Sequence, residues 1–147
     1  MSSNNEDIDD LNLSREVEIK SNNNGYKLVL KWLSSEQLVA TLIGPGIKLS
    51  NSVWLLACDD YLADYWLELA AAWDGWSGDK VWTSLEGELN FSGSHDGKGT
   101  VTVRIQMQYG LPKGWVATAF LELDPGSSLD ALAEKMKVFR DMQPGKR

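Results

Sequence analysis

The chain has one cysteine, Cys58, among its 147 residues. A single thiol forms no intramolecular disulfide and no multi-cysteine zinc site, so packing must hold the fold together. A domain of this length buries about 70% of the surface that its unfolded chain exposes, which is enough for such a core. The sequence therefore predicts one domain without a structural metal or a cofactor.

Long apolar runs are also missing. No apolar segment of the length that a secretory signal needs follows Met1, and no run is long enough to span a bilayer. These absences favour a cytoplasmic protein with no membrane partner. Export by a route that needs no signal peptide stays open.

Basic residues are few and scattered. The net charge is −7, and the closest basic cluster is the terminal pair Lys146 and Arg147. Nucleic-acid binding needs a concentrated basic face that displaces counterions from phosphates, so we expect no nucleic-acid partner. A protein partner with a basic surface suits this charge better.

Composition divides the chain into three parts. Residues 1–14 carry acidic side chains and no basic one, and we expect a disordered acidic tail there. Residues 15–142 alternate regular elements with short turns, as a single α+β domain does. Residues 143–147 contain Pro144 and Gly145 and are expected to form a flexible C-terminus.

Alternating apolar and polar residues predict strands at 15–20, 26–33, 36–43, 47–57, 83–94, 100–109 and 115–123. Every connection between neighbouring strands is short, which demands antiparallel pairing. One-sided alternation indicates a sheet with one buried face, which helices cover. We therefore predict a single twisted antiparallel sheet of six to seven strands with two helices on one face, in the order ββββαβββα.

Two segments have helical spacing instead, residues 61–73 and a segment that starts near Ser127. In the first segment the apolar stripe includes two tryptophans, which we expect in the core. The two stripes are Leu62, Tyr65, Trp66, Leu69, Ala70 and Trp73, and Leu129, Leu132, Met136 and Phe139.

His95 is the only histidine, the side chain that most readily exchanges protons near neutral pH. Beside Asp96 it could act as a general base. It also ends a predicted strand next to the Asp96-Gly97 hairpin signal, where polar residues are expected without any catalytic role.

Glu86 and Glu88 stand two apart on a predicted strand, so both are expected on the same face. Paired carboxylates divide acid and base work when their environments differ. With His95 they define the alternative function, a hydrolase-type enzyme at the sheet edge. The simpler interpretation is that they solvate an exposed face.

Seven tryptophans are unusual for a chain of this size, and two of them, Trp76 and Trp82, flank a glycine-containing loop. Tryptophan is enriched at the energetic centre of protein interfaces. If exposed, these two would form an acidic, aromatic binding patch with Asp74, Asp79 and Glu86. Alternatively, they fold back and close the end of the sheet.

Three segments carry a resemblance: Trp73-Asp74-Gly75-Trp76, then 82–89 (WTSLEGEL), then Ser94-His95-Asp96-Gly97. Together they resemble a family of small uncharacterised bacterial proteins with W-x-G-W, W-x-S-L-E-G-E-L and H-D-G motifs. The resemblance covers roughly residues 26–140, and this chain departs from it mainly in its longer acidic tail. The family implies no activity, cofactor or catalytic residue.

These observations favour a non-catalytic protein-binding module over an enzyme. An immunity-type inhibitor of a basic toxin is its sharpest version, by loose analogy with other small bacterial α+β proteins. A self-associating domain that uses an exposed strand edge is a further possibility, and the oligomeric state stays open. The candidate binding residues are Trp76, Trp82, Glu86, Glu88, His95 and Asp96.

Overall fold

The computed structural model describes residues 15–55, 61–110 and 113–145. The acidic tail, Cys58 and the pair Lys146 and Arg147 lie outside these residues. Two helices and two four-stranded antiparallel sheets make up the described chain, in the order ββββαββββα. The α+β class is confirmed, whereas the predicted single sheet of six to seven strands is wrong.

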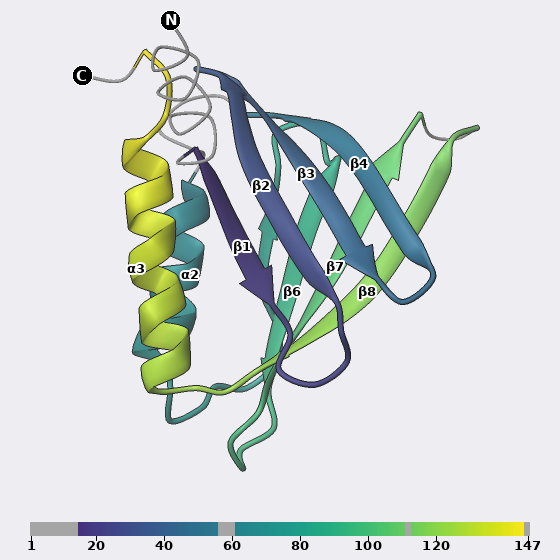
Figure 1. Ribbon diagram of the computed structural model, residues 1–147. Helices are drawn as coiled ribbons and strands as arrows, with labels where there is room; N and C mark the ends of the chain where they lie inside the picture. The colour runs from purple at the N-terminus through teal and green to yellow at the C-terminus, as the bar shows by residue number, and fades with distance from the viewer. Residues whose placement is uncertain (1–14, 56–60, 111–112, 146–147) are drawn as a thin grey trace, which may run out of the picture.

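The first sheet is a simple meander (Figure 1). Neighbours along the chain are also neighbours in the sheet, because two- to six-residue turns join the strands. Its strands are β1 (Glu16–Lys20), β2 (Lys27–Ser34), β3 (Gln37–Gly44) and β4 (Ile47–Trp54).

The second sheet repeats this arrangement after the first helix. Helix α2 (Leu62–Ala71) precedes it and α3 (Ser127–Asp141) follows it. Its strands are β5 (Lys80–Thr83), β6 (Leu89–His95), β7 (Val101–Tyr109) and β8 (Trp115–Leu123).

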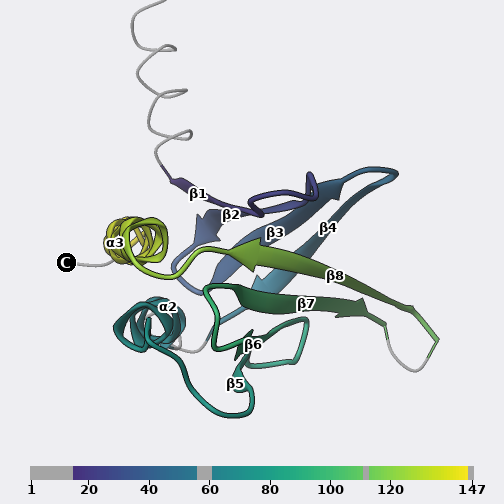
Figure 2. The same ribbon diagram turned by 90° about the horizontal axis from the view of Figure 1, so that it is seen from below.

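The sheets face each other across one hydrophobic core, and the two helices lie side by side at one end of them (Figure 2). Two apolar faces bury each other in this arrangement, so one-sided alternation is satisfied by two sheets as well as by one. Hydrogen bonds also join the two sheets. Asn51 Nδ2 on β4 donates to the Gln108 carbonyl on β7 at 2.8 Å, and the Asn22 amide donates to the Glu122 carbonyl on β8 at 2.8 Å.

The strand prediction over 83–94 is wrong because a tight hairpin interrupts it. The Gly87 amide donates to the Ser84 carbonyl, and Gly87 has a φ of +77°, which a residue with a side chain rarely adopts. Leu85 therefore lies exposed in the turn. The alternating pattern continued through the turn by coincidence, and it concealed the short strand β5.

The predicted core residues are mostly confirmed. Each inward position expected on β1 and β7 is buried except Tyr109, and the α3 stripe is buried throughout. Trp32 on β2 stacks on Phe139 at 5.1 Å, and its indole N–H donates to the Phe139 carbonyl at 2.8 Å. This contact attaches α3 to the first sheet. Among the described residues, neither helix is long and apolar enough to cross a membrane.

Helix α2 approaches β6 closely at Gly93. A Cβ added at Gly93 would lie 2.9 Å from the Tyr65 hydroxyl and 3.6 Å from Leu69. Tyr65 also stacks on Phe91 at 5.8 Å, and Trp66 meets the same ring edge-on at 5.3 Å. The missing side chain of Gly93 is therefore what lets the helix seat its aromatic residues on the strand.

We predict that Gly93→Ala lowers the free energy of unfolding by about 1–3 kcal/mol, because its methyl group overlaps the Tyr65 hydroxyl. In a Tyr65→Phe background the same substitution should cost clearly less. Urea unfolding of the four proteins measures both penalties. Ser92→Ala, on the outward side of β6, is the control and should stay within about 0.5 kcal/mol. Equal Gly93→Ala penalties in the two backgrounds would show that the hydroxyl is not the obstacle.

Candidate functional site

The loop of residues 72–79 follows α2 and lies against the end of β6. Its turn is closed by the Gly75 amide, which donates to the Ala72 carbonyl at 2.9 Å. Gly75 has a φ of +125°, and a Cβ there would lie 3.5 Å from the His95 ring. Two of the segments that carry the predicted motif, one on each side of β5, therefore meet here.

His95 fixes this loop through both ring nitrogens. Nε2 lies 3.0 Å from the Trp73 carbonyl, and Nδ1 lies 2.8 Å from the Gly97 amide nitrogen. A carbonyl only accepts and an amide only donates, so Nε2 carries the proton and Nδ1 has none. Both nitrogens are occupied by backbone groups, which leaves His95 as a positioning residue between loop and hairpin.

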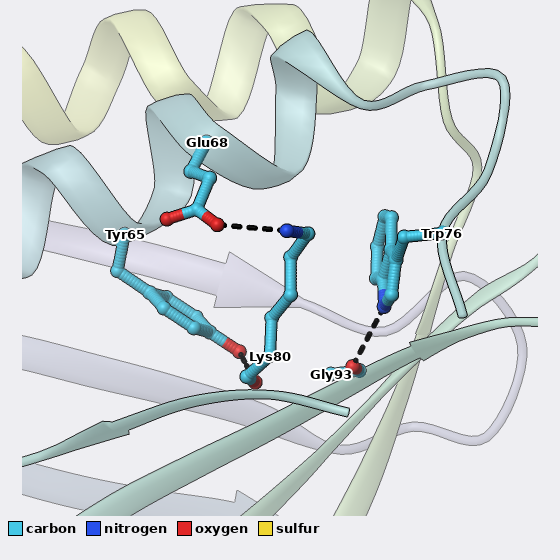
Figure 3. A network of polar contacts seen from close by, with 5 residues as sticks. All are labelled: Tyr65, Glu68, Trp76, Lys80 and Gly93. Carbon is cyan, nitrogen blue, oxygen red and sulfur yellow. Dashed lines mark hydrogen bonds and ion pairs between the residues drawn. The ribbon is translucent and has the colours of Figure 1, made fainter. Parts of the chain in front are cut away.

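Trp76 belongs to this loop, and its half-buried side chain forms the second contact that fixes the loop to β6 (Figure 3). Its indole N–H donates to the Gly93 carbonyl at 3.1 Å, and its ring meets the His95 ring edge-on at 5.4 Å. The Lys80 ammonium lies 5.7 Å from the centre of the Trp76 ring and pairs with Glu68 at 2.8 Å. Cation, ring and carboxylate together tie the loop to α2 and β5.

Tyr65 completes the network shown in Figure 3. Its hydroxyl donates to the Lys80 carbonyl at 2.8 Å. Burial, with a smaller effect from the negative charges of Glu68 and Asp79, raises the pKa of the Tyr65 hydroxyl well above its usual range. A raised pKa keeps the hydroxyl protonated near neutral pH, as a donor of this bond must be.

Asp96 organises the hairpin that follows β6. One of its carboxylate oxygens accepts from the amides of Lys98, Gly99 and Thr100 at 2.7, 3.0 and 3.0 Å. These bonds, that from Lys98 first, lower the pKa of the Asp96 carboxyl below its usual 3.8. The Asp96 carboxylate therefore stabilises its own hairpin turn, and it remains exposed to solvent.

The remaining candidate binding residues, Trp82, Glu86 and Glu88, lie near the opposite end of β6. Trp82 is buried and stacks on Phe91 at 5.4 Å. Glu88 accepts from the Ser84 hydroxyl at 2.7 Å and from the Trp54 amide at 3.1 Å, so it connects β4 to the hairpin of the second sheet. Glu86 is exposed in the turn. The prediction that Glu86 and Glu88 share one strand face is therefore wrong.

The alternative enzyme site is not assembled. Glu86 and Glu88 precede β6 and His95 ends it, so the length of β6, about 20 Å, separates them. A proton relay needs groups within hydrogen-bond reach or one water apart. Within the described residues no group of three or more His, Cys, Asp or Glu side chains could hold a metal ion either.

The loop presents Trp73, which sequence reasoning assigned to the core. Helix α2 ends at Ala71, and the Trp73 side chain is 60% exposed. The helical spacing ran two residues past the end of the helix, and the Asp74-Gly75 pair was the signal that the periodicity no longer applied. Trp73 thus has an exposed ring on a backbone that His95 and Trp76 hold in place.

Acidic residues belong to the loop of this tryptophan and to the hairpin joined to it. Asp74 and Asp79 belong to the same loop, and Asp96 belongs to the hairpin that His95 joins to it. All three are exposed. Lys98 is the nearby base of the hairpin, and Lys80 is already paired with Glu68. We call Trp73, Asp74, Asp79 and Asp96 the Trp73 surface.

We predict that the Asp96 carboxyl titrates below pH 3.8, because ionised Asp96 receives three amide bonds that the protonated form loses. The hairpin is therefore stabilised above this pKa and loosens as the pH falls through it. NMR titration of the Asp96 carboxyl carbon measures the midpoint, and the amide shifts of Lys98 and Gly99 should follow the same curve. A midpoint at or above 3.8, or amides that do not move with it, would contradict the assignment.

Comparison with known proteins gives a family and no activity. A model for a family of unknown function, DUF6228, matches residues 31–143. No curated protein and no solved structure matches the chain. The match spans most of the region, roughly 26–140, over which the sequence resembled a family without an assigned activity. The chain therefore belongs to DUF6228, a family of unknown function.

Proposed function

We propose that this chain is a non-catalytic protein-binding module that meets its partner through the Trp73 surface. The observation that carries the proposal is a tryptophan that is 60% exposed on a loop whose backbone is fixed from two sides. An exposed tryptophan of this kind gains little from folding, because most of its apolar ring still meets water. It would gain from burial against a partner.

The rigidity of the loop supports this function energetically. Association loses affinity whenever a mobile segment must be ordered at the interface. Here the Trp73 carbonyl is held by His95, and the loop behind it is held by Trp76 through the Gly93 carbonyl. The ordering cost is thus met during folding, which favours tight binding through a single aromatic anchor.

The charge of the surface indicates the kind of partner. Asp74 and Asp79 have no hydrogen bond or ion pair within the described residues, and Asp96 is bonded to backbone amides only. Lys98 offsets part of their charge. The chain as a whole carries −7. A partner with a basic contact surface would be attracted to this region, and an immunity-type inhibitor that covers a basic toxin is its most specific form.

The non-catalytic part of the proposal is supported by the way the reactive groups are used. His95 has both ring nitrogens bonded to backbone groups, and Glu88 bonds to Ser84 and the Trp54 amide. These two motif residues are therefore engaged in holding the fold, whereas Glu86 is exposed in its turn, at the other end of β6 from His95.

We predict that Trp73→Ala weakens binding to the physiological partner about 30-fold or more, the effect of losing an anchor worth about 2 kcal/mol. The immobilised full chain is used to capture proteins from the source cells, and the affinity of the recovered partner is then measured by calorimetry. Trp54→Ala is the matched control, because it removes another tryptophan, 45% exposed, far from this loop.

Two results support the proposal together: a partner that binds the wild-type chain and Trp54→Ala alike, and an affinity that falls with added salt. Loss of binding in Trp73→Ala must occur without a change in unfolding free energy. A partner that binds Trp73→Ala as tightly as the wild-type chain would contradict the proposal, as would capture of no partner from source cells and neighbouring gene products.

A further inference from the structure

The outer faces of the two sheets differ in charge. The outward positions of β1–β4 carry many ionised side chains: Glu16, Glu18, Lys20, Lys27, Lys31 and Lys48. The outward positions of β5–β8 are instead Ser, Thr, Asn, Gln, Val and Phe, with Arg104 and Glu122 as the charged residues. Both faces are wet in the single chain, so solubility alone does not explain the difference.

The face of β5–β8 also exposes apolar side chains. Strand pairing places Val81, Ser92, Arg104 and Phe120 in one row across all four strands. Val81 is 63% exposed and Phe120 is 50% exposed. Few charges together with exposed apolar groups are typical of the buried centre of a protein interface. No other described element covers this face (Figure 2).

The two charges of the face complement each other but do not pair within the chain. The Arg104 guanidinium has no hydrogen bond or ion pair among the described residues. Glu122 accepts from the Asn23 amide group through one carboxylate oxygen, at 2.7 Å, which leaves the other oxygen free. The register pairs Arg104 with Phe120 and Thr102 with Glu122, so the two charges are diagonal neighbours on β7 and β8.

We infer that this face binds a second copy of the same chain, with Arg104 of each copy paired to Glu122 of the other. A two-fold interface requires a patch that complements itself, and a patch with one cation and one anion does so through two identical ion pairs. A shallow hollow of about 270 Å³, lined in part by Arg104, Asn90 and Gln106, gives the incoming carboxylate room to reach the guanidinium.

The face is small for a dimer interface. The strands have 4, 7, 9 and 9 residues, which at about 3.3 Å per residue and about 4.8 Å between strands give a footprint of roughly 450 Å². This is below the roughly 800 Å² that each partner contributes to a standard interface. The dimer is therefore reversible and dissociates on dilution. The Trp73 surface is not part of this face, so dimerisation and partner binding are separate properties.

The experiment is sedimentation velocity of the full chain over a wide range of concentrations. The wild-type chain should shift from monomer to dimer as its concentration rises. Arg104→Glu and Glu122→Arg each place like charges together, and each should weaken the dimer at least tenfold. The double variant R104E/E122R restores opposite charges and should dimerise like the wild-type chain. Recovery in the double variant is a result that simple damage to the fold does not produce.

Three controls separate the possible causes. Lys48→Glu makes the same change in net charge as Arg104→Glu but on the other sheet, and should leave the dimer intact. Asn23→Ala removes the partner of Glu122 within the chain and should also leave it intact. Trp73→Ala should dimerise normally even if it loses the binding partner. A wild-type chain that stays monomeric, single variants that dimerise normally, a double variant that stays monomeric, or equal weakening by Lys48→Glu would each overturn the inference.

Discussion

The close contact between helix α2 and strand β6 at Gly93 determines the rest of this half of the molecule. With no side chain at Gly93, Tyr65 and Leu69 approach the strand directly, and Tyr65 stacks on Phe91. The Tyr65 hydroxyl then reaches past β6 to the Lys80 carbonyl and so sets the position of β5. The Gly93 carbonyl in turn accepts the Trp76 indole N–H. One small residue thus positions a helix, a strand and a loop.

The motif residues therefore have two separate tasks. At one end of β6, Trp82 fills the core and Glu88 ties the two sheets together. At the other end, His95 and Trp76 fix the loop that presents Trp73. Histidine, tryptophan and carboxylates suggest chemistry when they stand close in sequence. Here the polar atoms of His95 and Trp76 are bonded to backbone groups, and Trp73, which the helical spacing predicts in the core, is exposed.

Local pattern predicted the elements well and their assembly poorly. The alternation on β7 and the α3 stripe were correct because each follows from one face turned to a core. Whether strands belong to one sheet or two depends on contacts far apart in sequence, such as Asn51 with Gln108, which no local pattern reveals. The sequence pattern does not reveal the four-residue strand β5 or the turn at 84–88, because apolar and polar residues alternate without a break from the end of β5 through the turn into β6.

The candidate site could be located from the sequence but its roles could not. The motif segments indicated where the chain comes together, yet the task of His95 depends on the Trp73 carbonyl, 22 residues away. The central claim is that this contact and the Trp76 anchor make the Trp73 loop rigid before any partner binds. Backbone ¹⁵N relaxation of the free protein tests it most directly: we expect order parameters of about 0.85 at the amides of Trp73 and Trp76, equal to those of β6 and β7. Order parameters below about 0.6 across residues 72–79 would contradict the account.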